Sequence, residues 1–254
     1  MQVWSEPTDK PGSNRIGLAF EYLRLEDLAA LAGMLPQVPV QVVDRLERAA
    51  LTGDFSNGLI ALELNNGSVD NYLLDLSLDG ISYGQGSDLM RFKGVGARIQ
   101  ADQSQGKMTL DGRNGTLMLG SLFRQNIPFD HLTGDLYWQI SDSDWQLSTH
   151  NLRLTNADLS LVNRLVLSSG AEGELPVMDL RSRMVNATAT SVSRYLPAKI
   201  MEVSAVSWLD QAFLSGVADQ ADVVFYGRLD DFPFEEPTGI FEVRSHIKDI
   251  KLHY

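Results

Sequence analysis

The sequence predicts a mainly β protein built around a long, twisted antiparallel sheet with a few short helices. From residue 55 onward, apolar residues alternate with polar ones at the period of two that is typical of strands with one buried face. Gly, Asn and Asp lie in many of the connections between these segments, as tight turns require. Helical spacing of apolar residues is confined to residues of about 25–51 and 191–215.

Residues 1–120 are expected to form the first part of this sheet, together with two short helices within 25–51. A short strand is predicted at 15–21. Leucines and alanines then recur at helical spacing, with Gly33 near the end of the first helix and Gly53 as the cap of the second. We expect these helices to cover one edge of the sheet.

The strands of this first part are delimited by turn signals. Asn65-Asn66-Gly67 predicts a hairpin, and Asp79-Gly80 predicts the end of the following strand. Asn114-Gly115 predicts a turn into a strand at 116–119. Between these signals, one face of a strand is formed by Leu74, Leu76 and Leu78.

Residues 121–254 are expected to continue the same architecture, with a helical insert at about 191–215. Ser204 is the expected N-cap of its helix and Gly216 the residue that ends it. Strands at 221–229 and 239–246 are predicted to follow. The chain ends in a strand-like pattern, so we expect it to be a fragment of a longer protein. Apolar positions alternate at Leu132, Leu136, Trp138, Leu152, Leu154, Leu159, Leu161, Leu165 and Leu167.

The predicted sheet has more apolar surface than the few predicted helices can cover. A sheet of this many strands either folds onto itself as a sandwich or barrel, or curls into a trough with an open apolar face. Trp138 and Trp145 flank one predicted hairpin and could pair across it, in a packed core or along such a groove.

Composition excludes several classes of function. A formal net charge of -12 disfavours nucleic acid as a partner, and the absence of cysteine excludes disulfides and thiolate metal sites. The N-terminus has no signal-peptide pattern, and no apolar run is long enough to span a bilayer. The four histidines, His131, His150, His246 and His253, lack the spacing of metal ligands.

Neither an enzymatic activity nor a cofactor is expected. Three carboxylate pairs lie in predicted turns, where solvent contact is the ordinary explanation of such pairs: Asp142 with Asp144, Asp230 with Asp231, and Glu235 with Glu236. An envelope hydrolase that uses one of these pairs is the least favoured hypothesis.

Several sequence blocks in the second half resemble the YhdP family of AsmA-like proteins. They include Arg194-Tyr195-Leu196-Pro197, Trp208-Leu209-Asp210-Gln211 and Asp231-Phe232-Pro233-Phe234. Upstream, Pro128-Phe129-Asp130-His131 and the segment from Leu152 to Leu159 are similar as well. The resemblance is clearest over 120–254. It departs from the family at Glu202-Val203, where a proline-containing helix start is expected.

The resemblance implies a large protein anchored in the inner membrane of a Gram-negative bacterium, of which this chain is a periplasmic part. It implies a β-taco-like sheet curled into an open apolar groove, which carries phospholipids toward the outer membrane without catalysis. The implied partners are phospholipid acyl chains, neighbouring segments of the same chain and envelope proteins at either membrane. The alternative is a closed β-sandwich that serves as a scaffold for protein–protein interaction in the envelope.

A lipid groove also agrees with simple energetics. Each methylene kept from water is worth about 0.8 kcal/mol, so a two-tail lipid in open solvent faces a cost of roughly 20 kcal/mol or more. An apolar trough removes most of this cost. The residues predicted to line it are Leu74, Leu76, Leu78, Leu132, Leu136, Trp138, Leu152, Leu154, Leu159, Leu161, Leu165 and Leu167.

Overall fold

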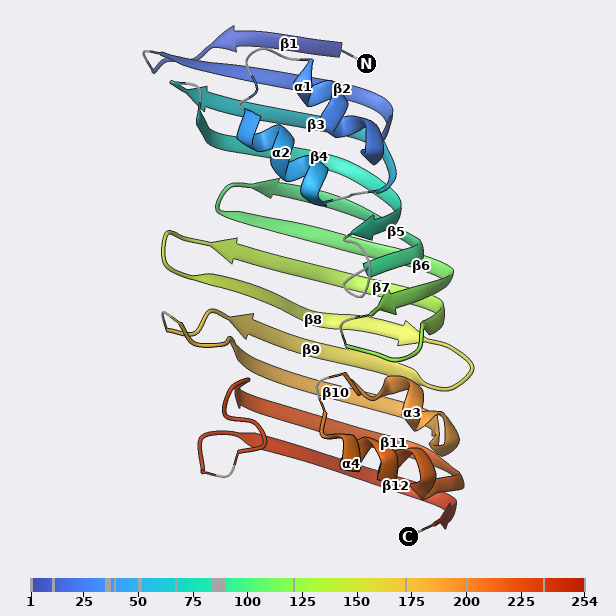
Figure 1. Cartoon of the computed structure of the whole chain (residues 1–254). Coiled ribbons are helices and arrows are strands. Elements are labelled where there is room, and N and C mark those ends of the chain that lie inside the picture. Colours follow the sequence, from blue (N-terminus) through green and yellow to red (C-terminus); the bar gives the residue numbers. More distant parts are fainter. Residues whose placement is uncertain are drawn as a thin grey trace.

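A single antiparallel sheet of twelve strands dominates the computed structural model of the chain, and each strand pairs with its neighbours in sequence (Figure 1). The structure describes residues 2–10, 12–34, 38, 40–49, 52–66, 68–83, 90–120, 122–171, 173–199, 201–234 and 236–253. The strands are β1 (Gln2–Pro7), β2 (Ser13–Arg24), β3 (Thr52–Asn65), β4 (Ser68–Tyr83), β5 (Met90–Asp102), β6 (Gln105–Leu119), β7 (Ile127–Ile140), β8 (Trp145–Thr155), β9 (Ser160–Ser168), β10 (Val177–Thr188), β11 (Phe213–Arg228) and β12 (Ile240–Leu252).

This topology confirms the predicted fold class and rules out the closed alternative. The strand order follows the sequence from β1 to β12, which are the two edges, so the sheet is neither closed into a barrel nor stacked as a sandwich. Strands β6 and β7, on either side of residue 120, pair like all other neighbours. The division of the chain at that residue stays a prediction.

Short helices interrupt the sheet at two places. Between β2 and β3 lie η1 (Leu25–Asp27), α1 (Leu28–Gly33) and α2 (Val40–Ala49). Between β10 and β11 lie η3 (Ala189–Ser191), α3 (Val192–Tyr195) and α4 (Val203–Ala212). The two predicted helical regions are therefore confirmed, although the second contains two separate helices.

The boundaries predicted for the second helical region are partly wrong. Glu202, in extended conformation, is the N-cap of α4 in place of Ser204, so the helix begins where the sequence departs from the family pattern. Strand β11 begins at Phe213, and Gly216 lies inside that strand with a φ of 132°. Gly216 is thus a bulge residue and does not end a helix, because the pairing of β11 with β12 shifts register between Ser215 and Val217, on either side of it.

Several predicted turns are also bulges within longer strands. Gly80, with a φ of 63°, lies at a register shift inside β4, and Asn114, with a φ of 48°, lies inside β6. Gly53, predicted as a helix cap, belongs to β3. Asn and Gly tolerate the left-handed conformation in a bulge as well as in a turn, so the local sequence does not distinguish the two. The hairpin after Asn65 is confirmed by its pairing with Ser68, while Gly67 lies outside the described residues.

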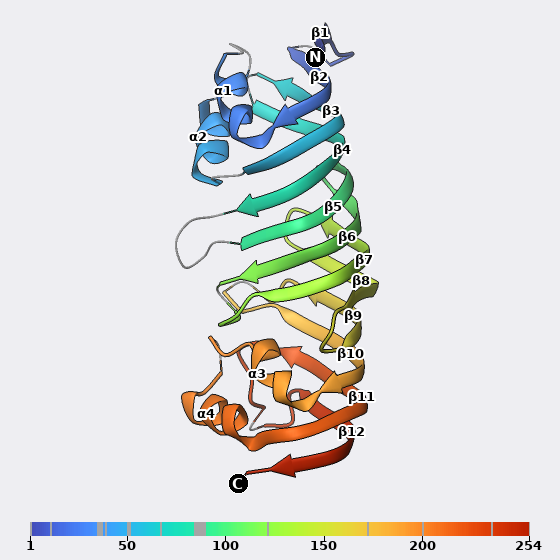
Figure 2. The ribbon, with the colours of Figure 1, turned by 90° about the vertical axis from the view of Figure 1, so that its right-hand side faces the viewer.

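The bulges occur side by side on neighbouring strands. A Cβ at Gly94 of β5 would lie 2.9 Å from the Cα of Gly115 on β6, beside the Asn114 bulge. A Cβ at Gly134 of β7 would lie 2.8 Å from the Cα of Leu152, where the β8 register shifts. Bulges bend the strands that carry them, and adjacent bulges bend the sheet as a whole. Figure 2 shows the strands bending toward the side that carries the helices.

The face toward which the strands bend, here called the inner face, carries the apolar side chains. Cross-strand pairing places Leu76, Ile99, Met108 and Leu136 in one row over four strands. The opposite side of the sheet is called the outer face. Two buried clusters lie on the inner face, one around Leu76 and Leu78 and the other around Phe129, Leu132 and Leu154.

Candidate functional site

All strand residues predicted to line a groove lie on the inner face. Leu74 of β4 pairs with Ala101 of β5, Ala101 with Gly106 of β6, and Gly106 with Trp138 of β7. This cross-strand row lies next to the row that contains Leu76 and Leu136. Leu132 pairs with Leu154, and Leu154 with Leu161. Leu165 and Leu167 continue along β9, and Leu152 lies opposite Asn163 on the same face. Leu159 precedes β9 by one residue and packs in the cluster of Leu154.

The rows of apolar side chains continue to the C-terminal edge. Leu161 pairs with Met184 on β10, and Leu165 with Leu180. Leu180 in turn pairs with Phe225 on β11, and Phe225 with Phe241 on β12. The apolar character of the inner face is therefore a property of the whole sheet and not of one cluster.

Trp138 and Trp145 do not pair directly across their hairpin. The register places Leu147 opposite Trp138 and Ile140 opposite Trp145. Both tryptophans share the inner face as diagonal neighbours. A period of two assigns the face of a residue, whereas its direct partner depends on the turn length, which the sequence left undefined.

The predicted residues differ in exposure along the strands. Five are buried with at most 6% exposure: Leu76, Leu78, Leu132, Leu154 and Leu159. The other seven are partly exposed: Leu74, Leu136, Trp138, Leu152, Leu161, Leu165 and Leu167. On β7 the change occurs within four residues, from buried Leu132 to partly exposed Leu136. The buried residues therefore form protein core, and only the partly exposed ones are available to a bound molecule.

The chain's own helices and loops account for the buried half. Leu31 of α1 packs against the cluster around Leu76 and Leu78. Tyr195 of α3 and Phe123, in the loop after β6, pack against the cluster around Leu132 and Leu154. Figure 1 shows no described helix in front of the middle of β6–β8, so within the described part of the chain α3 covers only the end of β7 and β8 that carries Leu132 and Leu154.

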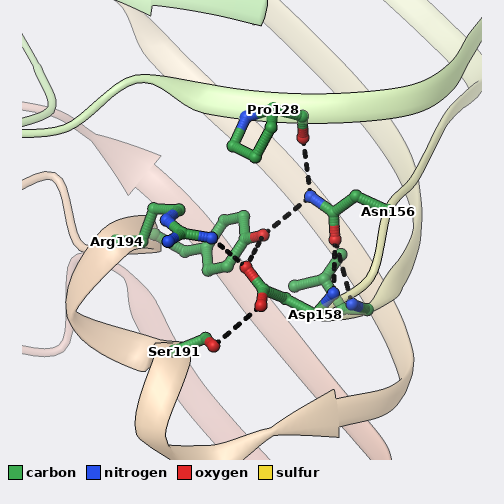
Figure 3. Close-up of polar contacts among 7 residues, drawn as sticks. Pro128, Asn156, Asp158, Ser191 and Arg194 are labelled. Carbon is green, nitrogen blue, oxygen red and sulfur yellow. Dashed lines mark hydrogen bonds and ion pairs between the residues drawn. The ribbon is translucent and has the colours of Figure 1, made fainter. Parts of the chain in front are cut away.

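A polar cluster fixes α3 to the sheet (Figure 3). Asp158, in the loop between β8 and β9, accepts hydrogen bonds from Ser191 Oγ and Tyr195 Oη, both at 2.9 Å, and pairs with the guanidinium of Arg194. Asn156 donates to Tyr195 Oη at 2.8 Å and to the backbone oxygen of Pro128 at 2.6 Å. One carboxylate and one amide thus hold the helix against the β8–β9 loop and β7.

Each member of this cluster is oriented by a further contact. The side-chain oxygen of Asn156 accepts from the backbone N–H groups of Asp158 and Leu159, at 2.9 and 3.1 Å, which closes the loop before β9. Burial raises the pKa of the Tyr195 phenol, so the hydroxyl stays protonated and donates to Asp158. The cluster can hold its geometry at neutral pH without a bound ion.

Three of the sequence blocks that resemble the YhdP family meet in this cluster. Pro128 belongs to the first block, Asn156 and Asp158 to the second, and Arg194 and Tyr195 to the third. Their contacts join residues up to 39 positions apart. The blocks therefore share a structural task, which is to place α3 over the inner face.

A second ion pair holds α4. Both terminal guanidinium nitrogens of Arg124 lie 2.7 Å from the carboxylate oxygens of Asp210, and Arg124 also donates to the Ser193 backbone oxygen at 3.4 Å. The hydrogen bond from Arg124 lowers the pKa of Asp210 below its usual range. Asp210 lies in one of the sequence blocks that resemble the family. The sequence did not reveal its partner Arg124, because no local pattern connects two residues so far apart in the chain.

Members of two of the carboxylate pairs considered for catalysis have structural partners. Asp144 accepts from Ser143 and Ser169, and Asp230 pairs with Arg228. Glu235 lies outside the described residues. Within the described ranges, no three histidine, aspartate or glutamate side chains gather as a metal site requires, and no helix has the length and hydropathy to cross a bilayer.

The fold and this face define a class of protein: an open, curled antiparallel sheet whose apolar face is covered only in part by its own helices. The family model described as "YhdP protein" matches residues 3–254, so the chain belongs to the YhdP family. This membership suggests an AsmA-like protein of the cell envelope, in a structural and transport family that is not enzymatic. Searches among curated proteins and solved structures found no match.

Proposed function

We propose that this chain is a segment of a lipid conduit in the periplasm, in a protein anchored to the inner membrane. In this proposal the inner face shields the acyl chains of phospholipids from water while they move between the inner and outer membranes. The observation that supports it most is the continuity of the apolar rows across successive strands, with partly exposed leucines where helical cover is absent.

The dimensions of the inner face agree with this role. A bilayer core about 30 Å thick holds two leaflets, so one acyl chain reaches about 15 Å, which corresponds to about three strand spacings. Strands β6–β9 therefore offer enough width for one tail beside Leu136, Leu147 and Leu167. The polar head groups could remain in water at the open side, so the role requires no specific polar site.

The free energy of moving an acyl chain from water to an apolar surface explains why such a surface would be needed. Each methylene that leaves water for an apolar contact gains about 0.8 kcal/mol, irrespective of the head group. A row of apolar side chains offers similar contacts at successive strands, so a tail can pass from strand to strand without a large barrier. Separate deep pockets would instead hold the lipid at one place.

Site-specific photocrosslinking in cells that produce the full-length protein tests the proposal. A photoreactive amino acid at Leu136 should capture phospholipid, because this side chain is partly exposed on the inner face. The matched control is the next residue, Tyr137, which is 37% exposed and points to the outer face. Equal lipid capture at both positions, or capture of protein alone at Leu136, would contradict the proposal.

A further inference from the structure

The outer face carries a pocket that the proposed lipid role does not use. Its volume is about 620 Å³, within the range of small-molecule sites, and its lining residues come from β3–β8. Two parallel cross-strand rows form its walls. One row contains Asp75, Gln100, Lys107, Tyr137 and Ser148 in successive strands. The other contains Gln105, Gln139 and Gln146.

The floor of the pocket is the backbone between these rows. Ala101, Gly106 and Trp138 line the pocket although their side chains belong to the inner face. The Trp138 indole lies against Gly106, where an added Cβ would come within 2.1 Å of the ring. The backbone is therefore closely packed from the inner side, and the pocket opens only on the outer face.

The charged groups of the pocket already have polar partners within the protein. Lys107 Nζ lies 3.1 Å from Asp135, and an Arg98 nitrogen lies 2.9 Å from Asp75. Asp102 accepts from the hydroxyl and backbone N–H of Ser104, each at 2.7 Å. A charged ligand would therefore have to displace an existing partner, so the pocket favours an uncharged one.

The amide groups, in contrast, have unused hydrogen-bonding capacity. The side chains of Gln105, Gln139 and Gln146 are exposed. Within the described residues those of Gln139 and Gln146 make no hydrogen bond, while Gln105 interacts with Asp102 through its backbone N–H and its side chain. Each amide offers two donors and a carbonyl acceptor, which matches a pair of adjacent hydroxyl groups or an acetamide. Because the three residues face one another on adjacent strands, they span roughly 10 Å.

An apolar wall completes the pocket. Tyr137 keeps 37% of its surface exposed, and its ring is fixed by Lys107 Nζ, 5.6 Å from the ring centroid. Leu73, 50% exposed, lies at the β4 end of the pocket. An aromatic ring beside amides suits the alternating C–H and O–H surfaces of a sugar.

We infer that this outer-face pocket binds an uncharged oligosaccharide, by its hydroxyl or acetamide groups. The row of Gln105, Gln139 and Gln146 contacts these polar groups, and the Tyr137 ring contacts a pyranose face. An acyl chain is excluded because it would bury the amides without partners. An extended peptide that adds as a strand would need a sheet edge, and the pocket lies far from β1 and β12.

Titration of the purified chain with chitotetraose and with cellotetraose, followed by calorimetry and saturation-transfer NMR, tests the inference. At least one of the two glycans should bind saturably. Gln139→Ala combined with Gln146→Ala should weaken binding about tenfold or more, as should Tyr137→Ala. The matched controls are Gln125→Ala, at an exposed loop position, and Tyr226→Ala, 52% exposed on another strand.

Unchanged circular dichroism and thermal midpoints would show that the variants are folded. Absence of saturable binding by both glycans would overturn the inference, as would equal weakening by the control substitutions. Lipid capture at Leu136 should be the same in the Gln139 and Gln146 variant, because that side chain lies on the other face. The inference and the proposed lipid role can therefore fail independently.

Discussion

Along β7 the inner face changes character within four residues. Leu132 is 4% exposed beneath Tyr195 and its neighbours, whereas Leu136 and Trp138, on the same face, are partly exposed. Near β9 the burial also changes: Leu159, just before the strand, is buried, whereas Leu161, Leu165 and Leu167 on the strand are partly exposed. One end of the strands is therefore a packed core and the other an accessible apolar surface, although the two have the same alternating sequence.

This difference shows that alternation alone does not predict core. The helix-covered end obtains its stability from the chain's own side chains, in particular the cluster that includes Phe129 and Leu154. The open end exposes apolar area that no described helix covers. Such a surface is tolerated where it serves binding, and it is unfavourable elsewhere.

Truncation of one leucine at each end gives the largest expected difference. Leu132→Ala should lower the free energy of unfolding by about 2–5 kcal/mol, because it leaves a cavity in packed core. Leu136→Ala should lower it by only about 1 kcal/mol, since its side chain is already partly in water. Urea denaturation of both variants measures the contrast. Equal losses would mean that the two ends are packed alike.

Removal of the carboxylate that holds α3 should have the next largest effect. Asp158→Ala leaves Arg194, Ser191 and Tyr195 without their acceptor and should cost about 1.5–3 kcal/mol. Urea denaturation and hydrogen exchange in α3 and η3 measure the change. The control Asp142→Ala, in the turn after β7, should stay within about 0.5 kcal/mol of the original chain. If both variants unfold alike, the cluster does not hold the helix.

A charged side chain at the open end of the strands should affect lipid binding more than it affects the stability of the fold. Leu136→Glu and Leu161→Glu should reduce the phospholipid that co-purifies with the protein, with less loss of stability than Leu132→Ala, because a partly exposed carboxylate keeps part of its hydration. Lipid extraction with mass spectrometry and circular dichroism measure the two effects. Normal lipid loading in both variants would show that these residues do not line the proposed conduit.

The smallest expected effect concerns pH. Because Arg124 lowers the pKa of Asp210 in the folded state, the pair stabilises α4 above the ordinary carboxyl pKa of 3.8, and this contribution is lost as the pH falls through the lower folded value. Asp210→Asn should therefore weaken α4 at neutral pH and make less difference well below pH 3.8. Amide exchange of Val206, whose N–H donates to the Glu202 oxygen in the first turn of α4, measures this. A constant difference at all pH values would contradict the assignment.

Sequence reasoning predicted the sheet, its antiparallel pairing and the shared face of the leucines, because a period of two assigns faces directly. It failed where the same local sequence is compatible with both a tight turn and a β-bulge. Asn114-Gly115 and Asp79-Gly80 have the residues of tight turns, yet both lie in bulges within longer strands. Only the pairing of the adjacent strand distinguishes these two uses.

The burial gradient and the polar cluster could not be predicted from local sequence patterns, because both depend on contacts between residues far apart in the chain. Leu132 and Leu136 are identical in type and phase, and the packing of distant side chains such as Phe123 and Tyr195 over one end makes only Leu132 part of the core. Likewise, Asn156, Asp158 and Arg194 belong to quoted blocks, but their contacts depend on how β8, β9 and β10 pair. The resemblance identified these residues without indicating their task.

The meander topology has a consequence for the span of the protein. Every strand hydrogen-bonds only to the strands before and after it in the chain, so twelve strands extend roughly 53 Å across the sheet at about 4.8 Å each. Duplication or loss of one hairpin would change this reach by roughly 10 Å and leave all other pairings intact. The distance bridged by such an architecture can therefore be adjusted in equal increments, two strands at a time, without a new core.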